Sequence, residues 1–124
     1  MNSKVFLILR IVFGLFLLTF GANKFLHFMP FGEMSEAGMA YFTALVSTKT
    51  VVMVGIIEII SALALLTNKY GALMMLILMS ISVNAVLFHA TLEPASIGGA
   101  LGLLVLNIVM LYGYKDKYKD LLQG

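Results

Sequence analysis

Two charged side chains stand inside long apolar runs, where a bare charge is costly. Arg10 lies in the first run, and Glu58 lies near the middle of the second. A carboxylate at the bilayer centre costs about 2.5 to 3.5 kcal/mol on insertion scales, so Glu58 should be neutralised by a proton or a cation. When the centres of the two runs are aligned, Arg10 lies roughly 6 Å along the axis from Glu58, which its long side chain can cover. The sequence therefore predicts an Arg10–Glu58 ion pair.

This pair has two interpretations. It can fix the register of two helices and do nothing else, because buried ion pairs serve specificity. It can also anchor the polar headgroup of a ligand or hold a proton. The positions three or four residues from Glu58 are Gly55, Ser61 and Ala62. Its face therefore carries small residues and should pack against other helices.

A polar stripe follows one face of the first run. Its members are spaced by three or four residues and are Arg10, Gly14, Leu17, Gly21 and Lys24. Glycines on such a stripe let helix backbones approach closely, so the stripe should face helices rather than lipid. Lys24 fits this stripe as well as it fits a side chain that reaches the outer lipid headgroups.

The outer ends of the apolar runs collect further polar residues. Lys24, His27, His89 and Glu93 should lie on one side of the membrane, where they can line an outward-facing pocket. No short His-to-His spacing supports a metal or haem site, so we predict none. Asn84 lies inside an apolar run, where asparagine commonly hydrogen-bonds between helices. The candidate ligand-binding residues are Glu58, Arg10, Lys24, His89 and Asn84.

The composition excludes a soluble globular domain. Of the 124 residues, 61% are hydrophobic and 11% are charged, and the mean hydropathy is +1.04. Cysteine is absent, which removes disulfides, thiol chemistry and Cys-ligated zinc or iron–sulfur sites. A net charge of +2 without a basic patch argues against nucleic-acid binding. Because no phosphate-binding loop or nucleophile elbow is present, the chain has no self-sufficient catalytic centre, and a partner must supply any redox centre.

Four apolar runs match a bilayer core of about 30 Å. They cover residues 5–22, 51–66, 72–88 and 97–112. We therefore predict an all-α integral membrane four-helix bundle that forms a single domain over residues 1–124. Most lysines flank the ends shared with the termini, so the positive-inside rule places both termini in the cytoplasm. In the long outer connection, residues 38–46 can form a helix along the membrane interface or a plain loop.

The last apolar run carries a packing motif. Gly98 and Gly102 form a small-xxx-small pair, and Asn107 follows them inside the same run. Such residues bring helices together, either within one bundle or between protomers. The sequence leaves both arrangements open.

The order of these motifs resembles the DoxX family of small four-span bacterial membrane proteins. The resemblance covers nearly the whole chain and depends on Arg10, Gly21-Ala22-Asn23-Lys24-Phe25, Val54-Gly55-Ile56-Ile57-Glu58, Asn84 to Phe88-His89, and Glu93-Pro94. The family takes its name from the small subunit of a thiosulfate to quinone oxidoreductase. The resemblance implies a role beside the quinone pool and directs attention to Glu58, Arg10, Lys24 and His89.

Two functions are therefore expected from different classes. The first is an inner-membrane subunit that supports an oxidoreductase complex and contributes to a quinone site, with no cofactor of its own. The second is a structural subunit that anchors a larger membrane assembly. The expected partners are the lipid bilayer and a membrane or redox protein, and a homo-oligomer is compatible with both functions. A ligand cavity lined by Glu58 and His89 would favour the first function.

Overall fold

The computed structural model describes residues 1–29 and 33–124, and these are almost entirely helical. The five α-helices are α1 (Ser3–Leu26), α2 (Glu36–Ser47), α3 (Thr50–Thr67), α4 (Gly71–Leu92) and α5 (Gly98–Gly113). Short 3₁₀ turns follow at η1 (Pro94–Ser96), η2 (Lys115–Tyr118) and η3 (Asp120–Leu122). Helix accounts for 84% of the structure, and the described ranges contain no strand. The all-α class is confirmed.

Three of the helices, α1, α3 and α4, are long and apolar enough to cross a membrane. The fourth expected span, α5, is apolar but has 16 residues, which is about 24 Å of helix. Large apolar side chains on the outer faces are exposed, among them Ile8, Leu15 and Leu63. Such faces belong in contact with lipid, so the described residues fit a membrane bundle of three to four apolar helices.

Two helices extend beyond the C-terminal ends that the sequence predicted, residue 22 for the first span and residue 88 for the third. α1 runs on to Leu26, and His27 closes it in the left-handed conformation by donating its N–H to the Asn23 carbonyl. α4 runs on to Leu92, because Pro94 disfavours helical backbone at Glu93 and ends the helix there. Each extension carries a polar side chain within one turn of the expected end, Lys24 in α1 and His89 in α4.

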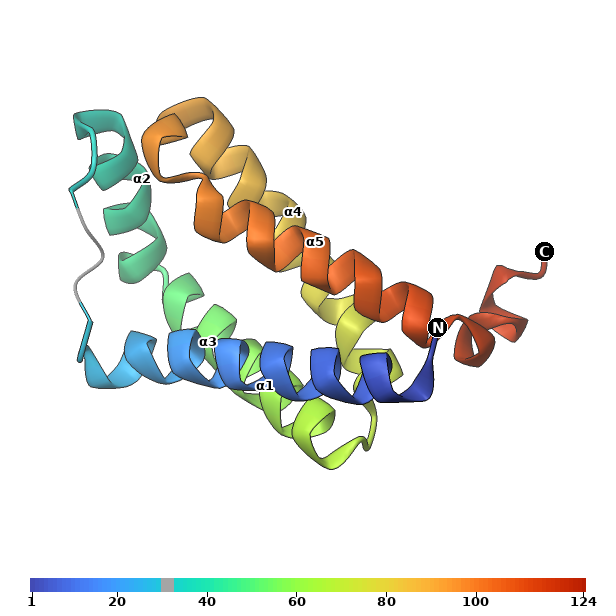
Figure 1. The fold of residues 1–124 in the computed structure, drawn as a ribbon. Coiled ribbons are helices and arrows are strands. Elements are labelled where there is room, and N and C mark those ends of the chain that lie inside the picture. The colour runs from blue at the N-terminus through green and yellow to red at the C-terminus, as the bar shows by residue number, and fades with distance from the viewer. Residues whose placement is uncertain (30–32) are drawn as a thin grey trace.

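The helices form two pairs that meet at one end and separate toward the other (Figure 1). α1 packs along α3, and α4 packs along α5. At the closed end Phe6 of α1 lies against Gly113 of α5, which brings the two chain termini to the same end of the molecule. α2 lies at the opposite end, where the two pairs have separated.

Glycines on α1 set its register against α3. A Cβ atom at Gly14 would lie 3.4 Å from the Ala62 carbonyl, and one at Gly21 would lie 3.2 Å from the Gly55 carbonyl. The two helices are therefore antiparallel and their backbones are close together along this line. Gly14, Leu17 and Gly21 are buried, which confirms that the small-residue stripe faces a helix.

The core of the closed end contains one polar connection between α4 and α5. Asn107 is fully buried; its Nδ2 donates to the Met75 carbonyl at 3.0 Å, and its Oδ1 accepts from the Ser82 hydroxyl at 2.7 Å. This confirms the expected interhelical role of Asn107. The fully buried apolar side chains of the core are Phe13, Leu17, Leu65, Met75, Leu78 and Met110.

Residues 38–46 are helical, as one of the two sequence interpretations expected. Ser35 caps α2 through its hydroxyl oxygen, which accepts from the Gly38 N–H at 3.0 Å. The Ser35 N–H and hydroxyl donate in turn to the carboxylate of Glu93 at the end of α4. At its other end α2 is joined to α3 by Thr48 and Lys49 alone. α2 is thus fixed to α4 at its start and to α3 at its end.

Candidate functional site

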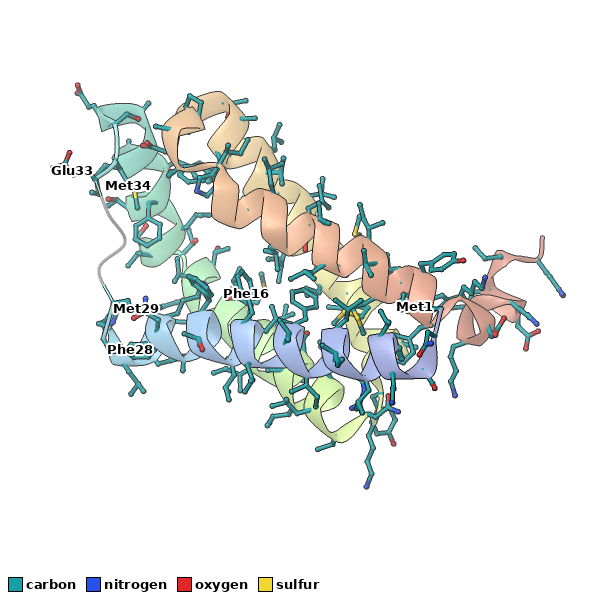
Figure 2. The ribbon with its side chains drawn as sticks, in the orientation of Figure 1. Met1, Phe16, Phe28, Met29, Glu33 and Met34 are labelled. Carbon is teal, nitrogen blue, oxygen red and sulfur yellow. The ribbon has the colours of Figure 1, made fainter. Side chains whose placement is uncertain are left out.

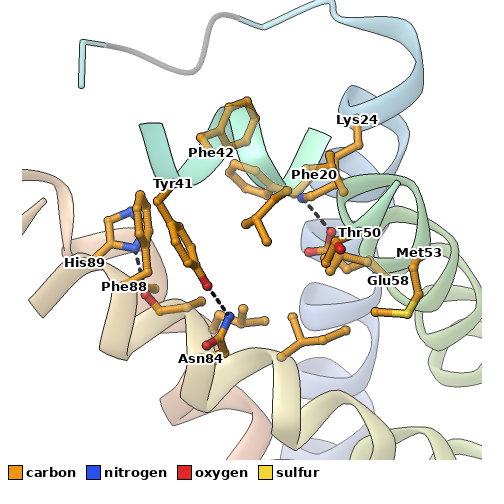
Figure 3. Close-up of a pocket in the computed structure, with 18 of the residues that line it drawn as sticks. Phe20, Lys24, Tyr41, Phe42, Thr50, Met53, Glu58, Asn84, Phe88 and His89 are labelled. Carbon is orange, nitrogen blue, oxygen red and sulfur yellow. Dashed lines mark hydrogen bonds and ion pairs between the residues drawn. The ribbon is translucent and has the colours of Figure 1, made fainter. Parts of the chain in front are cut away.

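A cavity of about 580 Å³ lies where the two helix pairs separate, and α2 covers it (Figure 3). All five helices contribute to its walls, and most of the lining is apolar or aromatic. Phe16, Phe20 and Lys24 recur every four residues of α1 and therefore share the face that lines the cavity. In Figure 2 Phe16 rises from α1 toward the α4–α5 pair. The other aromatic lining residues are Tyr41, Phe42, Phe88 and His89.

One wall carries an ion pair between α1 and α3. Lys24 Nζ lies 2.6 Å from Glu58 Oε1, and the two side chains are 18% and 5% exposed. Glu58 sits opposite Gly21, because the α1–α3 register places that glycine against the Glu58 Cβ. Lys24, one turn further along α1, is therefore the cation within reach. The expected Arg10–Glu58 pair is wrong.

Arg10 has a different partner at the closed end of the bundle. Its Nη1 donates to the carbonyls of Leu65 and Leu66, the latter at 3.4 Å, in the last turn of α3. The last carbonyls of a helix lack partners within the helix, and a guanidinium can satisfy them. Arg10 thus caps the C-terminal end of α3 and does not line the cavity.

The opposite wall carries a second polar group. Asn84 Nδ2 donates to the hydroxyl oxygen of Tyr41 at 3.4 Å. The Tyr41 ring is stacked on Phe88, with ring centroids 5.1 Å apart and ring planes 21° apart. Figure 3 shows the Tyr41 hydroxyl and Asn84 on one side of the cavity, with Lys24 and Glu58 across from them. Two polar groups therefore face each other across an apolar space.

His89 lines the same cavity from the end of α4. Its Nδ1 lies 2.8 Å from the Ala85 carbonyl, and its ring meets Phe88 edge to face. A carbonyl can only accept a hydrogen bond, so Nδ1 carries a proton and a neutral ring keeps Nε2 as an acceptor. No residue in the described ranges bonds to Nε2.

Two residues expected at an outward-facing pocket are elsewhere. His27 is exposed at the end of α1 and takes no part in the cavity wall. Glu93 is buried, but it binds Ser35 at the start of α2. Among residues 1–29 and 33–124, no group of three His, Asp or Glu side chains is placed to hold a metal ion.

The structure brings four of the five ligand-binding candidates to one cavity: Lys24, Glu58, Asn84 and His89. Arg10 is the exception. Tyr41 was missed, although it lies in the predicted interfacial segment, because no sequence pattern indicated which bundle opening that segment would cover. Comparison of the chain with protein-family models, curated proteins and solved structures found no match.

Proposed function

We propose that this chain is a membrane subunit that holds a quinone-class ligand for a partner oxidoreductase. The observation that supports it is the cavity, which combines an apolar, aromatic lining with two opposed polar groups inside an apolar bundle. The proposed setting is the bacterial inner membrane, with both termini in the cytoplasm.

The lining suits a planar ring with an apolar tail. Aromatic side chains offer flat faces for a ring, and methionine and phenylalanine adapt to an isoprenoid chain. Ligand pockets commonly measure about 300 to 1,000 Å³, so the cavity is large enough for a quinone headgroup and the first part of its tail. The ammonium group of Lys24 can donate to a ring oxygen without giving up Glu58, since it has three N–H donors.

Electron transfer would need a partner. The chain contains no cysteine to hold an iron–sulfur cluster, so in this proposal it supplies the binding site and the partner supplies the redox centre. The DoxX resemblance supports the same division, because that family is described among parts of membrane oxidoreductase assemblies.

The test is the lipid that copurifies with the protein. Wild-type protein would be purified from native membranes, and bound lipid extracted and analysed for quinone. Glu58→Gln keeps the shape of the side chain but removes the charge that positions Lys24, so we expect a several-fold loss of bound quinone. Glu33→Gln, an exposed position outside the cavity, is the matched control and should bind as wild type does. Absence of quinone from repeated wild-type preparations would contradict the proposal.

A second candidate function, anchoring a larger assembly, is favoured by one feature of α5. A Cβ atom added at Gly98 or Gly102 would meet nothing within 4 Å, so this small-residue face has room for another helix. A partner captured by wild type and lost in Gly102→Ile, with bound quinone absent from both, would favour this function over the first.

A further inference from the structure

We infer that Tyr41 recognises the second oxygen of the ligand ring, so that the cavity selects rings with an oxygen at each of two opposite ends. This inference depends on the proposed function and narrows the quinone class to rings whose two oxygens lie at opposite ends. It adds a ligand-contacting residue on α2, the helix whose structure the sequence left open.

The orientation of Tyr41 is set by two neighbours on α4. The stack on Phe88 fixes the plane of the ring, and Asn84 donates to the phenolic oxygen. Because that oxygen already accepts a hydrogen bond, its own O–H is available to donate to another group. Figure 3 shows this hydroxyl directed into the cavity.

The opposite wall supplies the other contact. Lys24 remains close to Glu58 and has N–H donors to spare, so it can donate to an oxygen at the near end of a ring. A ring held between the two walls would then be contacted at both ends. A ring with a single oxygen would leave one donor without a partner, which lowers affinity.

The Tyr41 hydroxyl is not needed to hold α2 in place. The start of α2 is fixed by the contact between Ser35 and Glu93, and its end is joined directly to α3. The stack on Phe88 depends on the ring and survives loss of the hydroxyl. Tyr41→Phe should therefore keep the fold and remove one donor.

The experiment compares two ring probes on the purified full chain by calorimetry. Duroquinone has a carbonyl at each end of a tetramethylated ring, and acetyldurene is a tetramethylated ring with one carbonyl. Wild type should bind duroquinone about three- to tenfold more tightly, as expected for one net hydrogen bond. Tyr41→Phe should lose this preference and keep its affinity for acetyldurene. Tyr112→Phe, which loses a hydroxyl from the exposed ring at the far end of α5, is the matched control.

The outcomes distinguish a failure of the role given to Tyr41 from a failure of the proposed quinone site. A preference for duroquinone that persists in Tyr41→Phe, or that wild type never shows, overturns the role of Tyr41 and leaves the proposed quinone site standing. Failure of wild type to bind either probe, together with no copurified quinone, overturns the proposed function itself. If Tyr41→Phe fails to fold, Asn84→Ala at an exposed position replaces it, since loss of the orienting amide should weaken the preference.

Discussion

Lys24 and Glu58 are best understood as one unit. Each charge is removed from water, and the close approach of Nζ and Oε1 compensates part of the cost. The sequence showed that Glu58 needs a cation, because a lone carboxylate inside an apolar run is expensive. It did not show which cation, since Arg10 and Lys24 lie on the same helix face and only the register against α3 decides between them.

The first prediction separates the structural role of this pair from its role in binding. Lys24→Met leaves the Glu58 carboxylate buried without its cation, so we expect a loss of about 3 to 5 kcal/mol in stability. Lys24→Met with Glu58→Leu removes both charges and should recover most of that loss. Thermal unfolding in detergent measures the effect.

The double variant also tests whether Lys24 and Glu58 contribute to quinone binding. It should fold and yet bind much less quinone, because both charged groups of that wall are gone. A double variant as unstable as the single one would show that the two charges do not act as a unit. One that binds quinone as wild type does would place the headgroup elsewhere in the cavity.

The second prediction concerns Tyr118 in the C-terminal tail, whose hydroxyl donates to the Ala72 carbonyl at 2.7 Å. Burial, with a smaller contribution from Tyr114, raises the pKa of this phenol from 10.0 to about 12. The unfolded chain therefore loses this proton first, and the stabilisation, complete below about pH 10, is lost as the pH rises toward about 12. Tyr118→Phe should be less stable than wild type near neutral pH, and the difference should shrink over that range. Unfolding followed at several alkaline pH values measures it; a constant difference would contradict the role of burial.

At the level of the helices, the contact between α1 and α3 positions the cavity wall. The sequence predicted the two helices and the faces that meet, because small residues marked both. It did not determine their register, which the alignment of span centres placed wrongly. Gly14 and Gly21 are seven residues apart, as are Gly55 and Ala62, and an antiparallel match of the two pairs places Arg10 at the end of α3.

The attachment of α2 could not be predicted in the same way. Its contact with Glu93 joins residues 58 positions apart in the chain, and no periodicity reports such a contact. Gly38 is the tight point, because a Cβ atom there would collide with the Glu93 carboxylate.

The third prediction therefore concerns Gly38→Ala. We expect it to detach the start of α2 from α4 and to expose residues 36–47 to hydrogen exchange. Gly98→Ala places the same methyl group where nothing lies within 4 Å and should leave exchange unchanged. Equal protection of α2 from exchange in both variants would show that the contact between Ser35 and Glu93 does not hold the start of α2 against α4.

For the molecule as a whole, the helix pairs meet at the end that holds both termini and separate toward the other (Figure 1). The cavity lies between the separated pairs. The sequence predicted an all-helical membrane protein because composition and run length suffice for that. It could not predict a cavity, because the angle between two helix pairs depends on contacts spread along the whole chain.

The fourth prediction uses the absence of native cysteine. Single cysteines at Asn2, Lys49 and Gln123 would each be the only thiol for a membrane-impermeant maleimide. All three positions are exposed. With both termini in the cytoplasm, intact cells should label Lys49→Cys alone, and lysed cells should label all three. Different labelling of Asn2→Cys and Gln123→Cys would contradict the placement of both termini on the same side of the membrane. Labelling of both in intact cells would show that the orientation is the opposite of the predicted one.

The bond from Arg10 to the end of α3 bears on how this protein suits its bilayer. α3 has 18 residues and measures about 27 Å, slightly less than a hydrocarbon core of about 30 Å. The turn after α3 donates backbone N–H groups to the carbonyls of Ala64 and Leu65, and Arg10 adds a charged donor at Leu65 and Leu66. Because this donor is a side chain of α1, the last turn of α3 depends less on water or lipid headgroups for its hydrogen bonds, and bilayers that differ by a few ångströms in thickness should leave it intact.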